Sequence, residues 1–176
     1  MNKISLLILK FVLTIPVVYA LSYPFLHPEA NAGVFREVQM LGVTGSVIVG
    51  LLFLGAIVLY CRDLQRTLSL LQANSRVASP RSVWWMFFMP FNFVEDFFIV
   101  ANVARSLRNE AQNNPALAGL KSFGLWSGIG WCSAQIISLI PHELGALGSL
   151  FALLFWVVHW RFIRQVNSRL LGQRLT

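Results

Sequence analysis

Long apolar runs constrain this chain more than any other feature of its sequence. Residues 40–61 hold no charged side chain, and about 20 such residues cross the hydrocarbon core of a bilayer as a helix. Comparable runs cover residues 4–26, 120–140 and 144–162. The whole chain is 56% apolar and 12% charged, whereas soluble domains carry about 25% charged residues. The sequence therefore predicts one all-α integral membrane domain, residues 1–176, with four transmembrane helices.

The first apolar run has two interpretations. It follows Lys3, and the small-residue patterns at residues 18–20 and 30–32 resemble signal-peptidase cleavage sites. Lys10, however, interrupts the apolar stretch, and the run is long enough to span. We favour an uncleaved first helix, in which Lys10 extends toward the cytoplasmic interface.

Small residues recur every fourth position in three of the expected helices. Such stripes let a neighbouring helix approach closely, so we expect helix-packing faces and no ligand chemistry there. Leucines at helical spacing also continue the 40–61 run, which predicts that this helix projects beyond the membrane. The stripes are Gly42, Ser46 and Gly50; Gly124, Gly128 and Cys132; and Gly148 with Ala152; the leucines are Leu64, Leu68 and Leu71.

Residues 80–112 are the ambiguous stretch. Ser79 followed by Pro80 is typical of a helix start. Pro90 interrupts the helix, because proline removes a backbone hydrogen bond. A second helical segment is predicted from about residue 91 to 112, ending before Asn113-Asn114-Pro115.

The distribution of Lys and Arg favours a stretch that does not span. Basic residues flank it on both sides: residues 62–81 hold four arginines, and residues 105–121 hold Arg105, Arg108 and Lys121. Cytoplasmic connections are enriched in Lys and Arg, and a spanning helix would place one of these flanks outside. We expect a Pro-broken amphipathic element, interfacial or re-entrant, with both termini in the cytoplasm. A spanning helix at residues 83–104 is the alternative.

Helical periodicity sorts this element into two faces. One face is predicted to be polar and to meet water, lipid headgroups or a partner, while the other is apolar. Tandem tryptophans suit the headgroup zone. The candidate functional polar face comprises Asn92, Glu95, Asp96, Asn102, Ser106 and Asn109, and the candidate lipid or partner contacts are Trp84, Trp85, Arg105 and Arg108.

Other reactive side chains indicate no chemistry of their own. Cys61 and Cys132 form neither a disulfide framework nor a metal-binding spacing. The pairs His27 with Glu29 and His142 with Glu143 lack the spacing of a zinc site, and His159 is expected to anchor the helix at the cytoplasmic interface. No nucleotide loop or nucleophile motif occurs, and no basic patch of the nucleic-acid type. We therefore expect no catalytic residue, no cofactor, no metal and no nucleic-acid partner.

The residues around Pro90 carry a resemblance. Val83-Trp84, Asn92, Ser106-Leu107 and Glu110, with the two prolines, resemble a signature of small multi-pass bacterial membrane proteins that carry a domain of unknown function. Met89 stands where isoleucine is usual, and Glu95-Asp96 where apolar residues are usual. The resemblance implies a helical inner-membrane protein and no particular activity.

Two functions are compatible with these patterns. The first is a non-enzymatic accessory, scaffold or regulatory subunit, whose amphipathic element and basic connections engage anionic lipid, a protein partner or a second copy. The alternative is a small oligomeric solute or ion transporter that uses Glu95 and Asp96, because ionisable groups at membrane depth are usually functional. A membrane enzyme ranks third.

Overall fold

The computed structural model describes residues 2–27, 41–141 and 143–175, and that part of the chain contains helices but no strand. The predicted all-helical class is confirmed. Three helices are long and apolar enough to cross a membrane: Ile4–Leu26, Gly42–Leu70 and Glu143–Gln173. The elements in order are α1 (Lys3–Leu26), α3 (Gly42–Leu70), the 3-10 helix η1 (Pro80–Phe87), α4 (Asn92–Ala111), the 3-10 turn η2 (Pro115–Leu117), α5 (Leu125–Ile137) and α6 (Glu143–Leu175).

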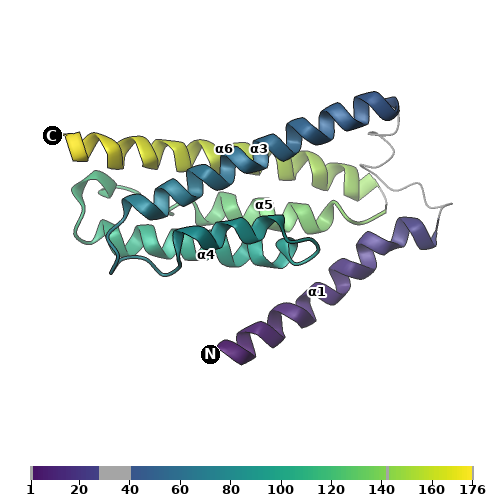
Figure 1. Cartoon of the computed structure of the whole chain (residues 1–176), viewed down its shortest axis with the longest axis horizontal. Helices are drawn as coiled ribbons and strands as arrows, with labels where there is room; N and C mark the ends of the chain where they lie inside the picture. The colour runs from purple at the N-terminus through teal and green to yellow at the C-terminus, as the bar shows by residue number, and fades with distance from the viewer. Residues whose placement is uncertain (1, 28–40, 142, 176) are drawn as a thin grey trace.

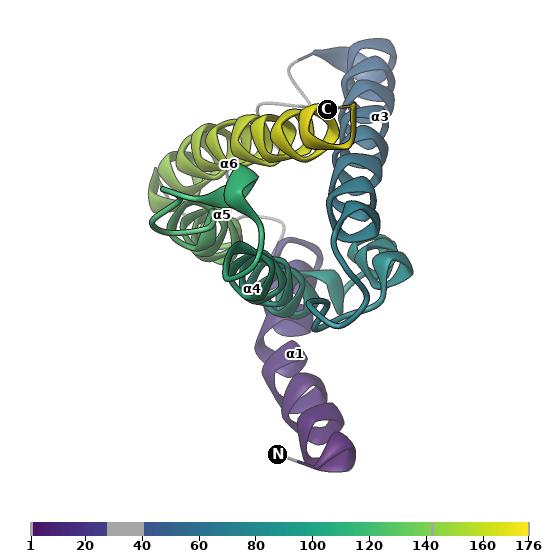
Figure 2. The same cartoon turned by 90° about the vertical axis from the view of Figure 1, so that its left-hand side faces the viewer.

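Four of the helices form a bundle, and α1 lies beside it. Figure 2 shows α3, α4, α5 and α6 arranged around a common centre, with α1 projecting away next to α4. Helix α1 packs on α4 through an edge-to-face contact of Phe11 with Phe91, whose ring centroids are 5.0 Å apart. Thr14 and Val17 are buried, while most large apolar side chains of α1 are exposed. A surface of this kind is suited to lipid.

Helix α3 has two halves with different surroundings. Its first half exposes large apolar side chains, and a Cβ added at Gly50 would meet nothing within 4 Å. Its second half buries Leu64 and Leu68, and Leu71 is buried just after the helix ends. The predicted continuation of this helix past residue 61 is therefore confirmed, and its projection beyond the membrane stays a prediction. In the stripe expected to pack against a helix, a Cβ added at Gly42 or Gly50 would meet nothing within 4 Å, so these two positions are open in the described structure.

The segment around Pro90 runs away from the end of the molecule where α3 finishes and then returns to that end. Ser79 accepts a hydrogen bond from the Arg81 N–H (3.4 Å), and Pro80 begins η1 as a 3-10 helix. Helix α4 then runs back from Asn92 to Ala111, parallel to α3 and toward the end where α3 finishes (Figure 1). The predicted helix start, the break and the stop before Pro115 are all present. Both ends of this element lie on one side of the bundle.

Helices α5 and α6 form a hairpin of unequal lengths. Helix α5 has 13 residues where the sequence predicts a span at 120–140, so it extends about 20 Å, less than the ~30 Å hydrocarbon core. Helix α6 has 33 residues and continues well beyond the predicted end at 162. The two helices run in opposite directions, so α5 returns the chain to the end where α6 begins (Figure 1).

Glycines let α5 approach its neighbours, as predicted for two of the small-residue stripes. A Cβ at Gly128 would collide with Val100 of α4, and one at Gly148 would lie 2.7 Å from the Ser138 backbone nitrogen. Gly124 precedes α5 with φ +76°, a conformation that L side chains rarely adopt. These contacts fix α5 between α4 and α6. The buried cluster that results draws on all four bundle helices and η1, with Tyr60, Leu64, Val83, Val100, Leu107, Cys132 and Ile163 fully buried at its centre.

Candidate functional site

The predicted polar face of α4 does not meet water along its length. Asp96 is 2% exposed and Ser106 is fully buried. Ser106 Oγ accepts from the Val77 N–H at 2.9 Å, and Asn109 Nδ2 donates to the Ser75 carbonyl at 3.2 Å. The expectation of a solvated face is therefore wrong for Asp96 and Ser106, whereas Asn109 is exposed. The chain's own segment after α3 covers Ser106.

Glu95 and Asp96 point in different directions and have different partners. The Lys10 ammonium of α1 contacts both carboxylate oxygens of Glu95, at 2.6 and 2.8 Å, and lies 4.5 Å from the Phe98 ring centroid. The two side chains are 18% and 20% exposed. The charge of Glu95 is thus compensated, and the contact joins α1 to the bundle.

Asp96 instead faces the interior without a counter-charge. Its Oδ1 has no hydrogen-bond partner within the described chain. Removing an isolated carboxylate from water is so unfavourable that such a group takes up a proton or acquires a partner. Four further buried polar atoms nearby in the bundle are also without a partner: Tyr60 Oη, Asn92 Oδ1, Gln135 Oε1 and Trp156 Nε1.

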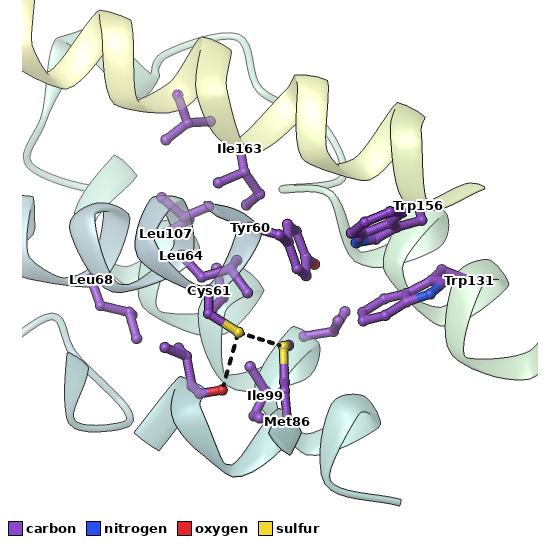
Figure 3. Packing of buried hydrophobic residues seen from close by; sticks show 14 of the residues in the cluster. Tyr60, Cys61, Leu64, Leu68, Met86, Ile99, Leu107, Trp131, Trp156 and Ile163 are labelled. Atoms are coloured by element: carbon purple, nitrogen blue, oxygen red, sulfur yellow. Dashed lines mark hydrogen bonds between the residues drawn. The ribbon is translucent and has the colours of Figure 1, made fainter. Parts of the chain in front are cut away.

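All five of these side chains line one cavity of about 520 Å³, between α3, the Pro90 segment, α4, α5 and α6. Native proteins leave few buried polar atoms unsatisfied, so five around one cavity indicate a place for a ligand or for ordered water. In Figure 3 the hydroxyl of Tyr60 lies toward the rings of Trp131 and Trp156. The Tyr60 ring meets both edge-to-face, with centroids 5.4 and 5.8 Å away.

The rim of the cavity belongs to the apolar surface. Phe53, Leu54, Met89 and Leu153 line the cavity and are each about half exposed or more. The same stretches of α3 and α6 carry the exposed apolar side chains that would face lipid. The wall of the cavity is therefore continuous with the exposed apolar surface of α3 and α6.

His159 is not the interfacial anchor that the sequence suggested. It is 1% exposed, and its Nδ1 lies 3.0 Å from the Gly124 carbonyl. Because a carbonyl oxygen only accepts, Nδ1 carries the hydrogen and Nε2 is left without a partner among the described residues. The buried imidazole packs where Gly124 and Gly128 leave room.

Hydrogen bonds from Trp160 and Asn167 join α6 to the second half of α3. Trp160 Nε1 donates to Asp63 Oδ2 at 2.7 Å, and Asn167 Nδ2 donates to the Asp63 carbonyl at 3.0 Å. A groove of about 670 Å³ beside them carries Arg62, Arg66 and Arg164. Periodicity gave no sign of this hydrogen-bonded group, since its members are about a hundred residues apart.

Glu110 stabilises the connection after α3. Burial favours its neutral form, but hydrogen bonds from Asn114 and the Gln72 N–H, with Ser75 and Arg76 nearby, lower the pKa of Glu110 below its ordinary 4.5. Arg76 also donates to the Leu71 carbonyl at 2.7 Å, at the C-terminal end of α3. This carboxylate is therefore a structural group.

The remaining predicted contacts and reactive residues are dispersed. Trp84 donates to Gln65 Oε1 at 2.6 Å and Trp85 is half exposed. Arg105 and Arg108 are exposed, and Arg108 lies 5.9 Å from the Phe123 ring. Cys61 and Cys132 are buried and form no disulfide. Both occupy positions that suit small apolar side chains. Glu29 and His142 lie outside the described residues, and Asn102 is half-buried beside Ser106.

Comparisons of this chain with protein-family models, with curated proteins and with solved structures give no match. The resemblance noted around Pro90 therefore stays a prediction.

Proposed function

We propose that this protein binds a small, largely apolar molecule that it takes from the bilayer into the cavity beside Asp96. The observation that carries the proposal is the group of five unpartnered polar atoms around a cavity with an apolar rim. Ligand sites are mostly apolar with a few placed polar groups, and volumes of about 300–1,000 Å³ are typical. A ligand with one hydrogen-bonding end and an apolar body satisfies both features.

The topology that accompanies this proposal places both termini on the cytoplasmic side of a bacterial inner membrane. The chain path supports it, because α1 and α5 run one way while α3, α4 and α6 run the other (Figure 1). The exposed arginines at the ends of α3, α4 and α6 agree with the enrichment of basic residues in cytoplasmic connections. In this topology the Pro90 segment enters the membrane from the cytoplasm, with Val83 and Met86 buried against the bundle and Phe88 and Met89 exposed.

Filling the cavity tests the proposal. Ala152 lines it and is buried, whereas Leu150 lies two residues away on α6 and is exposed. A panel of apolar amines, alcohols and amides would be added to purified protein in nanodiscs, and the shift in melting temperature measured. A ligand at 100 times its Kd adds about 2.7 kcal/mol to stability.

We expect the stabilising compounds to lose their effect in Ala152→Phe and to keep it in Leu150→Phe. Equal shifts in both variants would place binding elsewhere, and no shift with any compound would oppose the proposal.

Transport of the bound molecule is the second candidate, favoured by the depth of Asp96 between lipid-facing helices. Flux into proteoliposomes that stops in Asp96→Asn would support it. Glu95 enters neither proposal, since Lys10 already neutralises it. The accessory or scaffold role stays a prediction, now resting on the exposed Arg105, Arg108 and the basic groove.

A further inference from the structure

The charge content of the cavity restricts its ligand. Of the residues that line it, Asp96 is the one with a carboxyl group, and none is Lys, Arg or His. The nearest acidic neighbour, Glu95, is held by Lys10 on the other side of α4. An anionic ligand would find no basic group here and would meet a carboxyl. A cationic ligand would find a counter-ion.

Other titratable groups around Asp96 do not change this balance. Tyr60 and Cys61 of α3 and Cys132 of α5 are buried near it. Each is neutral when protonated and negative otherwise, so none supplies positive charge. His159 of α6 packs against Tyr60 with ring centroids 6.1 Å apart and already donates to a backbone carbonyl.

Aromatic rings supply a second source of attraction for positive charge. Trp131 and Trp156 line the cavity, and the Tyr60 hydroxyl lies toward both of their rings (Figure 3). Ring faces carry negative potential, and a cation placed over them is stabilised by about 0.5–2 kcal/mol. Aromatic walls with one carboxyl form the arrangement that recognises an organic ammonium group.

The remaining lining determines the kind of cation. Small inorganic cations bind where six or so oxygen atoms replace their hydration shell. Here most of the wall is hydrocarbon from side chains such as Leu54, Ile57, Phe93 and Leu153. A cation whose charge is shielded by apolar substituents fits this surface, and a bare metal ion does not.

We infer that the ligand of this cavity is a hydrophobic organic monocation, with Asp96 as its counter-ion and Tyr60, Trp131 and Trp156 as its aromatic wall. The inference rests on the proposed function, because it names the ligand class of the same cavity. On binding, the cation takes the place of the proton on the Asp96 carboxyl, and that proton leaves to water. The net charge within the cavity is then the same before and after the cation replaces the proton.

Two ions of matched shape and opposite charge test the inference. Tetraphenylphosphonium and tetraphenylborate would be titrated into the protein in nanodiscs of zwitterionic lipid. Binding to Ala152→Phe nanodiscs would be subtracted as partition into lipid. We expect saturable binding of the phosphonium, at least about ten-fold tighter than that of the borate.

Variants assign that preference to Asp96. Asp96→Asn keeps the size of the side chain and removes its charge, and we expect it to weaken phosphonium binding by about ten-fold or more. Glu95→Gln is the matched control and should keep binding within about two-fold. Trp156→Leu, expected to weaken binding several-fold, gives a second test in case Asp96→Asn alters the fold. A pH titration should show one proton released for each phosphonium bound.

The outcomes separate the inference from the proposed function. Tighter binding of the borate, equal binding of both ions, or full binding by Asp96→Asn would overturn the cation class, while cavity binding itself would stand. Absence of binding by either ion would also overturn the class. The proposed function fails only if the broader panel of neutral and charged compounds gives no shift that depends on Ala152.

Discussion

The contact between α4 and α5 predicts a large difference between two chemically identical substitutions. An alanine at Gly128 would place its Cβ against Val100, overlapping Cγ1 and lying 3.0 Å from Cγ2, with His159 Cε1 3.1 Å away. Ordinary carbon contacts lie at about 3.5–4.0 Å, so the helices must separate. Overpacking of this kind costs about 1–3 kcal/mol. Alanine at Gly50, where nothing lies within 4 Å, carries no such cost.

Comparing the two variants isolates the strain. Both variants replace a helical glycine with alanine. That replacement by itself stabilises a helix by about 1 kcal/mol, and this gain cancels when the two variants are compared. We expect Gly128→Ala to be about 1–3 kcal/mol less stable than Gly50→Ala. Reversible unfolding in mixed micelles with increasing SDS, followed by tryptophan fluorescence, measures both free energies.

Relief of the clash is the internal control. Val100→Ala removes the two methyl groups that Gly128→Ala would strike, so the double variant should recover at least about 1 kcal/mol relative to additivity. If Gly128→Ala and Gly50→Ala agree within about 0.5 kcal/mol, then α5 does not approach α4 as closely as described. The position of Trp131 and Gln135 in the cavity wall would then have to be fixed by contacts other than those between α4 and α5.

Three further predictions concern charge and topology. Lys10→Met or Glu95→Gln alone leaves one partly buried charge without its partner and should lower the free energy of unfolding by about 1–3 kcal/mol in the same assay. The double variant should be close to wild type in stability. Equal losses of stability in all three variants would show that the pair does not interact. Because the pKa of Glu110 in the folded protein lies below 4.5, its carboxylate contributes fully to the free energy of unfolding above pH 4.5, and this contribution is lost as pH falls through the folded pKa. Between pH 7 and about 3, the free energy of unfolding should therefore fall less in Glu110→Gln than in wild type. Cysteines introduced at Ala73 and Asn113, both exposed, should react with a membrane-impermeant maleimide from the same face, and reaction from opposite faces would refute the non-spanning Pro90 segment.

Local signals in the sequence were sufficient for the helix boundaries near Pro90. Ser79-Pro80 and Asn114-Pro115 act within one turn of chain, and both places start 3-10 segments capped by the preceding side chain. The extension of α3 was likewise visible, since Leu64 and Leu68 continue a helical spacing. The stop of α5 at Ile137 was not, because Leu139 and Ile140 continue the apolar run after Ser138; in the structure the end of α5 packs closely against Gly148 of α6.

The site depended on information that periodicity does not contain. Spacing shows that Asp96 and Ser106 share a face of α4, but it does not show that the segment after α3 folds over Ser106. Tyr60, Trp131 and Trp156 read as ordinary apolar members of separate helices, and Gln135 as a polar residue suited to bonding between helices. Their convergence with Asp96 is a tertiary property. The available signal was the presence of one carboxyl and one amide in otherwise apolar stretches.

The ion pair between Lys10 and Glu95 has a consequence for the order of biosynthesis. The partners are 85 residues apart in the chain, so at about 5–20 residues per second the ribosome makes Glu95 roughly 4–17 seconds after Lys10. During that interval we expect the ammonium of Lys10 to stay at the headgroups, where it orients α1. Arrested nascent chains should then show position 10 accessible to water in chains that end before α4 and protected in longer ones; protection in the short chains would contradict this order. The same lysine thus serves first as a topological signal and later as the ion-pair partner that holds α1 against the finished bundle.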